Sequence, residues 1–126
     1  MKESTFTINH RLKSFMYAFN GIKVLLKEEP NFIIHFILAL LAVIISWVLQ
    51  VSTWEWVAVI FCIAIVWVVE AINTVVENMA DFVCPEKNEK IKRIKDVSAA
   101  AVLISAIAAM IVGLIIFLPK ILLMVV

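Results

Sequence analysis

Long apolar segments alternate with short polar ones along the chain. Residues 32–51 contain no Asp, Glu, Lys or Arg, and residues 97–118 are apolar or small throughout. Between them, residues 57–69 carry no charge, and the sequence stays compatible with a helix to about residue 83. Each of these segments is long enough to cross a hydrocarbon core of about 30 Å. The pattern predicts three transmembrane helices, at about 32–51, 54–83 and 97–118.

The segment before the first apolar run is amphipathic. Phe15, Phe19, Ile22 and Leu26 are spaced by four, three and four residues, which places them on one face of a helix. A basic amphipathic helix beside a span typically lies in the membrane interface. We therefore predict a surface helix at about 7–29, with a soluble helix packed on a loop as the alternative. A secretory signal is not indicated, because a long charged segment precedes the first apolar run.

Breaker residues separate the predicted spans. Ser52-Thr53 makes a very short connection between the first two. Cys84-Pro85 is expected to end the second span, because proline cannot continue the hydrogen-bond ladder, and residues 84–95 are predicted to form a charged loop. Pro119 is expected to end the third span. Three tryptophans lie around the first connection, as is typical of an aromatic belt at the membrane surface: Trp47, Trp54 and Trp56.

Basic residues are distributed unevenly between the two sides of the predicted membrane protein. The turn at 50–53 has none, and Lys120 alone follows the third span. Because Lys and Arg gather in cytoplasmic segments, the N-terminus and the 84–95 loop are predicted to be cytoplasmic. The other ten Lys and Arg residues precede the first span or lie in the 84–95 loop: Lys2, Arg11, Lys13, Lys23, Lys27, Lys87, Lys90, Lys92, Arg93 and Lys95.

The composition supports an all-α integral membrane protein. The chain is 64% hydrophobic and 17% charged, with a mean hydropathy of +1.07, whereas soluble domains are about half apolar and a quarter charged. Gly21 and Gly113 are the only glycines, which excludes a glycine-rich phosphate loop. The net charge of +1 creates no overall field that would attract nucleic acid. Cys62 and Cys84 would lie about 33 Å apart on one helix, too far for a disulfide.

Four polar residues share one face of the second predicted span. At about 100° per residue, Glu70, Asn73, Glu77 and Asp81 fall within a stripe about 100° wide, which we call the polar stripe. An acid at the centre of a spanning helix costs about 2.5–3.5 kcal/mol, so it needs a proton, a cation or a basic partner. The stripe alone leaves three interpretations open: hydrogen bonding between helices, an ion or proton pathway, and a catalytic or ligand site.

Groups outside the polar stripe favour a ligand site. Lys95 comes just before the third predicted span, where it is placed to contact phosphate oxygens, while Asp96 and Ser98 are placed to cap that helix. Glu29 ends the surface helix on the same side. Carboxylates from two elements suit Mg²⁺, which takes one or two of them and shares substrate phosphates. His35 has two open interpretations, a contact to a lipid headgroup or a packed structural histidine.

The third predicted span carries small residues at every fourth position. This pattern lets another helix approach closely. It fits either packing within the chain or assembly of several copies, and it leaves the number of subunits open. The small residues are Ala101, Ser105, Ala109 and Gly113.

Three segments together resemble a known family. They are GIKVLLKEEPNFIIH at 21–35, VVEAINTVVENMAD at 68–81 and KDVSAAAVL at 95–103. Their order and spacing are similar to those of the small prokaryotic membrane lipid kinases, the diacylglycerol kinases and undecaprenol kinases, over about residues 11–118. The resemblance implies a homotrimer in the bacterial inner membrane, with active sites between neighbouring subunits at the cytoplasmic surface. It implies ATP as donor, Mg²⁺ as cofactor and a lipid primary hydroxyl as acceptor.

The resemblance also implies roles for individual residues. Glu70 matches the general base, and Asn73 matches a polar residue that supports the centre. Glu29 and Glu77 match the acids that hold the metal ion against the nucleotide. Four further positions match nucleotide-binding residues: Tyr17, Glu86, Lys95 and Asp96.

The sequence departs from the enterobacterial diacylglycerol kinases at several positions. The Glu-Glu-x-Asn-Phe-x-x-His pattern of residues 28–35 is instead similar to undecaprenol kinases, which favours undecaprenol as the lipid. The positions that differ from the enterobacterial enzymes are His10, Asn88, Ile94 and Ala99.

Two other functions compete with the lipid kinase: a small ion or proton transporter, and a non-catalytic assembly subunit.

Overall fold

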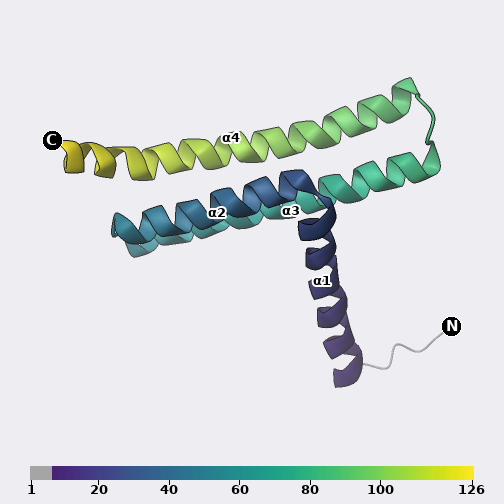
Figure 1. Ribbon diagram of the computed structural model, residues 1–126, viewed down its shortest axis with the longest axis horizontal. Coiled ribbons are helices and arrows are strands. Elements are labelled where there is room, and N and C mark those ends of the chain that lie inside the picture. Colours follow the sequence, from purple (N-terminus) through teal and green to yellow (C-terminus); the bar gives the residue numbers. More distant parts are fainter. Residues whose placement is uncertain (1–6) are drawn as a thin grey trace.

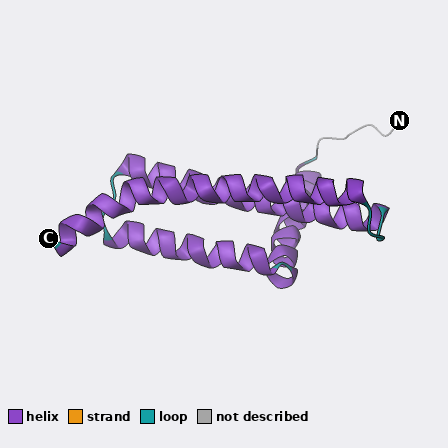
Figure 2. Ribbon diagram, turned by 90° about the horizontal axis from the view of Figure 1, so that it is seen from above, coloured by secondary structure: helices purple, strands orange, loops and turns teal. Residues whose placement is uncertain are grey.

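A computed structural model describes residues 7–126, so that Lys2 lies outside the described residues. This part of the chain folds into four helices, with three helices side by side and the first one projecting across them (Figures 1 and 2). The three helices that lie side by side are long and apolar enough to cross a membrane. The predicted all-α architecture, a surface helix and three spans, is therefore confirmed. The helices are α1 (Ile8–Glu28), α2 (Pro30–Val48), α3 (Thr53–Val83) and α4 (Glu89–Val125).

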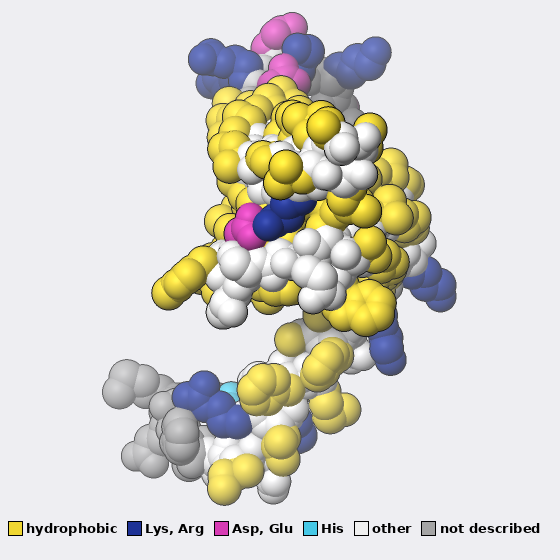
Figure 3. Space-filling view, turned by 90° about the vertical axis from the view of Figure 1, so that its left-hand side faces the viewer, with side chains coloured by type: hydrophobic (Ala, Val, Ile, Leu, Met, Phe, Trp, Pro, Cys, Tyr) yellow, Lys and Arg dark blue, Asp and Glu magenta, His cyan; other side chains and the backbone are white. Residues whose placement is uncertain are grey.

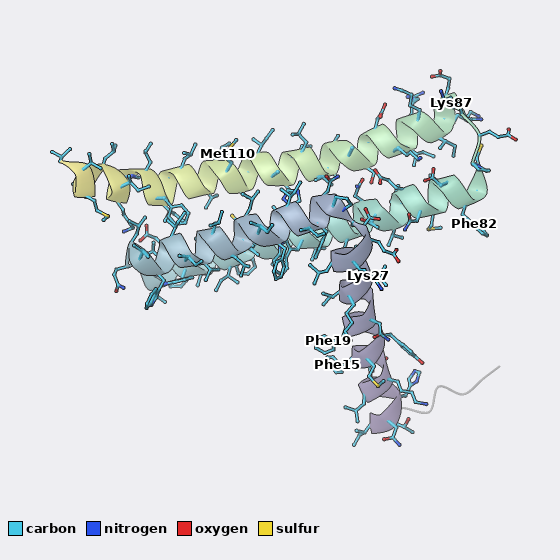
Figure 4. The ribbon with its side chains drawn as sticks, in the orientation of Figure 1. Phe15, Phe19, Lys27, Phe82, Lys87 and Met110 are labelled. Atoms are coloured by element: carbon cyan, nitrogen blue, oxygen red, sulfur yellow. The ribbon has the colours of Figure 1, made fainter. Side chains whose placement is uncertain are left out.

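Helix α1 has an apolar face without a partner in the described chain. None of its side chains is buried, and Phe15 and Phe19 are 63% and 64% exposed. Both project from the side of α1 toward which the spans extend (Figure 4). A helix lying across the spans with its aromatic side chains turned along them suits a membrane interface. This arrangement favours the interfacial helix over the soluble alternative.

The corner between α1 and α2 is built from one dipeptide. Glu29 has an extended conformation and is both the C-cap of α1 and the N-cap of α2, and Pro30 begins α2. Proline disfavours helical angles in the residue before it, and its own fixed φ suits the first turn of a helix. The sequence Glu29-Pro30 therefore ends one helix and starts the next without a loop, and it fixes the position of the Glu29 carboxylate.

Helices α2 and α3 are joined at the opposite end of the bundle. Ser52 and Glu55 form a capping box, in which Ser52 Oγ accepts from the Glu55 amide (3.2 Å) and Glu55 Oε1 accepts from the Ser52 amide (2.9 Å). Glu55 also accepts from Lys120 Nζ at 3.1 Å, which ties the start of α3 to α4. Glu55 thus caps α3 and also links it to α4 through the ion pair with Lys120.

Helix α4 is longer than the sequence indicated. It begins at Glu89 and continues through Pro119 to Val125, so the loop at 84–95, the caps at Asp96 and Ser98, and the end at Pro119 were wrong predictions. Asn88 is the cap instead, with Oδ1 accepting from the amides of residues 90 (2.8 Å) and 91 (3.4 Å). The charged residues that follow are good helix formers, so charge did not mark a loop here.

Most apolar side chains of the long helices face outward. Figure 3 looks along the bundle and shows mainly hydrophobic side chains around its sides. Within the described chain, a small buried cluster of Val51, Val59 and Ile116 lies near the α2–α3 connection. Ser46 on α2 is fully buried and donates to the Ala42 carbonyl (2.7 Å). Such a surface is stable only against lipid or other apolar helices.

Candidate active site

The first part of the polar stripe of α3 faces the inside of the bundle, while Asp81 at its end is exposed. Glu70, Asn73 and Thr74 are all buried, with exposed fractions of 2%, 7% and 6%. Glu70 lies opposite α2 and Asn73 lies opposite α4, as their contacts below show. Hydrophobic side chains cover the other faces of α3, so the helical spacing sorts polar from apolar residues.

Glu70 is the most deeply buried acid of the described chain. Its Oε2 atom is buried and forms no hydrogen bond with any described residue. His35 Nε2 is 3.7 Å from this oxygen, and Glu29 and Glu77 are also close enough to act on it electrostatically. A buried oxygen without a donor is costly, and in a native protein it indicates a functional group or an absent ligand.

Asn73 is oriented by a residue that the sequence analysis had assigned elsewhere. Ser98 Oγ donates to Asn73 Oδ1 at 2.7 Å, which joins α3 to α4 within the partly buried site. This bond occupies the amide oxygen and leaves the amide NH₂ of Asn73 as a donor toward the site. The signal for Ser98 was its position three residues after Lys95, which places both on one face of α4.

Lys95 forms an ion pair with Asp81 between α3 and α4, near the connection that joins them. This pairing gives Asp81 the partner that sequence analysis could not assign. Asp96 is held on α4 by Lys92, whose Nζ is 3.0 Å from Asp96 Oδ2. The Lys95 and Asp81 side chains are 35% and 59% exposed, so an incoming anion can reach the lysine.

Two predicted nucleotide-binding residues lie apart from this cluster. Tyr17 is 68% exposed on α1, and Glu86 is exposed in the short connection between α3 and α4. Neither forms a hydrogen bond or ion pair with the polar stripe in the described part of the chain. Glu29 and Glu77 are half-buried, one at the α1–α2 corner and one on the stripe.

An apolar cavity of about 500 Å³ opens between α2, α3 and α4. It extends from the level of His35 and Trp67 to Val59 and Phe117, toward the α2–α3 connection. His35 is the one basic side chain among its lining residues, and most of the others are aliphatic or small. The buried acid and the apolar cavity therefore adjoin at His35. Sequence reasoning did not predict this cavity, because it depends on how three helices pack.

Comparison with known proteins identifies the family. The family model for prokaryotic diacylglycerol kinase matches residues 16–117. An undecaprenol kinase of Bacillus subtilis (strain 168) is 33% identical over 113 residues, 90% of this chain and 92% of that protein. A diacylglycerol kinase of Escherichia coli (strain K12) is 32% identical over 111 residues, 88% of this chain and 91% of that protein. Given the length of these matches and the three-span fold, the chain belongs to the prokaryotic diacylglycerol kinase family.

Proposed function

We propose that the chain is a lipid kinase that transfers the γ-phosphoryl group of ATP to the primary hydroxyl of a membrane lipid. The observation that carries this function is the position of Glu70, a buried acid that meets an apolar cavity at His35 and lies on the same helix as Asp81, the partner of Lys95. A lipid can bring its hydroxyl along the apolar side, while phosphates approach Lys95 from water. Membership of the family supports the same reaction.

In the proposed reaction, Glu70 acts as the general base. Its carboxylate takes the proton of the lipid hydroxyl while the hydroxyl oxygen forms a bond to the γ-phosphorus. The bond from that phosphorus to the bridging oxygen breaks, and ADP leaves with the electron pair. Phosphoryl transfer requires mainly positioning and charge stabilisation, so a base, a cation and amide donors are sufficient side-chain chemistry.

Asn73 and the α4 residues would hold the phosphates. The Asn73 NH₂ group, oriented by Ser98, is a donor toward the phosphoryl oxygens. Lys95 would exchange its ion pair with Asp81 for the more highly charged phosphates. Asp96, Glu86 and Tyr17 complete the proposed nucleotide site around the outside of this cluster.

Glu29 and Glu77 fit a metal ion that arrives with the nucleotide. Among residues 7–126, no cluster of three or more His, Cys, Asp or Glu forms a metal cage. Mg²⁺ typically binds one or two carboxylates and completes its shell with phosphates and water. One carboxylate from the α1–α2 corner and one from the polar stripe match that requirement. When bound, the ion would neutralise charge on the phosphates.

We propose undecaprenol rather than diacylglycerol as the acceptor lipid. The Glu-Glu-x-Asn-Phe-x-x-His pattern of residues 28–35 supports this choice, and the Bacillus subtilis relative is named an undecaprenol kinase. The cavity beside His35 is apolar over most of its length, as the hydrocarbon chain of either lipid requires.

The first test is direct phosphorylation. Purified protein with labelled ATP and Mg²⁺ in mixed micelles should phosphorylate undecaprenol more efficiently than diacylglycerol. Glu70→Gln should lower kcat by about 10²- to 10⁴-fold with little change in the KM for ATP, because only the proton acceptor is lost. If neither lipid is phosphorylated and Glu70→Gln instead abolishes ion flux into proteoliposomes, the chain is a transporter.

Substitutions of Lys95 and of Asp81 should change the KM for ATP in opposite directions. Lys95→Met should raise the KM for ATP about 10- to 100-fold, the equivalent of a lost charge-assisted bond of about 1.5–3 kcal/mol. Asp81→Asn should lower this KM by up to about fivefold, because it removes a competitor worth at most about 1 kcal/mol. Glu89→Gln, an exposed acid at the start of α4, is the matched control. An increase of KM in Asp81→Asn would contradict the exchange.

The orientation can be tested with the native cysteines. We propose that the N-terminus and the α3–α4 connection are cytoplasmic in the bacterial inner membrane. Lys87, which Figure 4 labels beside that connection, lies beyond α1 on the side of the bundle away from the α2–α3 connection. A membrane-impermeant maleimide should therefore label Cys84 in inverted vesicles and not in right-side-out vesicles. Cys84→Ser, which retains Cys62, is the control, and labelling in right-side-out vesicles would reverse the orientation.

We also propose that the working unit is a homotrimer. The most apolar stretch of α4 is only 11% buried within the chain, so a large apolar surface is available for other copies. A short amine-reactive crosslinker applied in detergent or membranes should give a ladder that ends at three copies. A ladder that stops at dimers would contradict the trimer.

A further inference from the structure

His35 has a defined position between Glu70 and the apolar cavity. Its Nε2 atom is 3.7 Å from the one buried acceptor that lacks a hydrogen bond in residues 7–126, Glu70 Oε2. Its side chain also lines the inner end of the cavity, where a lipid hydroxyl would arrive in the proposed reaction. The imidazole is thus adjacent to both the base and the path of its substrate.

Trp67 holds this part of α2 in place. Its Nε1 atom donates to the His35 carbonyl at 3.4 Å. Its ring stacks on Phe36 with centroids 5.4 Å apart, and it meets Phe32 at 5.9 Å with a tilt of 47°. Trp67 lies about one turn from Glu70 on α3, so these contacts fix the α2 backbone at the level of the acid. The position of His35 is consequently set by packing around Trp67.

The charges around Glu70 make His35 its one favourable neighbour. The other two groups that act on it electrostatically are Glu29, from the α1–α2 corner, and Glu77, from α3. Both are acids, and like charges oppose a second carboxylate nearby. On α4, Ser98 is already bonded to Asn73. His35 is therefore the described side chain best placed to stabilise a carboxylate at position 70.

We propose that His35 is a positioning residue that donates its Nε2–H to Glu70 Oε2 and so presents Oε1 to the lipid hydroxyl. This inference rests on the proposed role of Glu70 as the base. Catalytic contacts are often long before substrate binds and shorten in the complex, which is how the present 3.7 Å separation becomes a hydrogen bond. The hydroxyl proton goes to Oε1, while His35 keeps its own proton throughout.

The test compares two substitutions of His35. In His35→Leu, Glu70 loses the donor that orients it, so kcat should fall about 10- to 100-fold, the scale expected for a misplaced catalytic group. The KM for ATP should stay within about twofold of wild type, because nucleotide contacts are on other residues. His35→Gln retains an N–H donor of similar reach and should recover most of the lost kcat. Ile37→Leu, on the exposed side of α2, is the matched control.

A second measurement separates positioning from a structural role. Glu70→Asp shortens the acid by one methylene group and takes its oxygen out of reach of His35. In this background, adding His35→Leu should cost less than about threefold, since interacting residues are not additive. Equal losses in both backgrounds, or His35→Gln as impaired as His35→Leu, would overturn the proposal. So would a higher lipid KM with unchanged kcat, which would make His35 a headgroup contact. Absence of lipid phosphorylation in the wild type would instead refute the kinase itself.

Discussion

The cost of placing a carboxylate inside an apolar helix organises this molecule. Glu70 is only 2% exposed, and helices in lipid leave no backbone donors free to bond it. The acid lies on a polar helix face, next to a histidine on α2 and in the half of α3 that ends at Val83. Each of these features helps to keep the Glu70 carboxylate available in an apolar environment, where a carboxylate is energetically unfavourable.

Neighbouring parts of the fold place the remaining groups around that acid. The Glu29-Pro30 corner brings a second carboxylate close enough to act electrostatically on Glu70, and the Asn88 cap lets α4 begin early enough to carry Lys95 on a rigid helix. Ser98 then fixes the amide of Asn73 from the α4 side. Glu70, Asn73 and Lys95 are thus on packed helices rather than on loops, which would suit the proposed reaction because it depends on positioning.

Sequence periodicity predicted the spans and the polar stripe because both are local properties of a helix. The bounds of α3 follow from its apolar run and from Cys84-Pro85, and the shared face of Glu70 and Asn73 follows from 100° per residue. Contacts between helices could not be obtained in this way. The pairing of Asp81 with Lys95, the bond from Ser98 and the cavity beside His35 all depend on packing between elements. The early start of α4 was missed for a different reason, because charged residues both form helices and fill loops.

The helix lengths have a consequence for how two unlike substrates meet. At 1.5 Å per residue, Glu70 lies about 26 Å along α3 from Thr53, where α3 begins. With Thr53 at one boundary of a hydrocarbon layer about 30 Å thick, Glu70 is only a few ångströms from the other boundary. In the proposed reaction, a lipid alcohol anchored at that boundary would reach this level without leaving its monolayer, and a nucleotide would reach it without entering the hydrocarbon interior. The depth of one side chain would then bring two unlike substrates together without a moving lid.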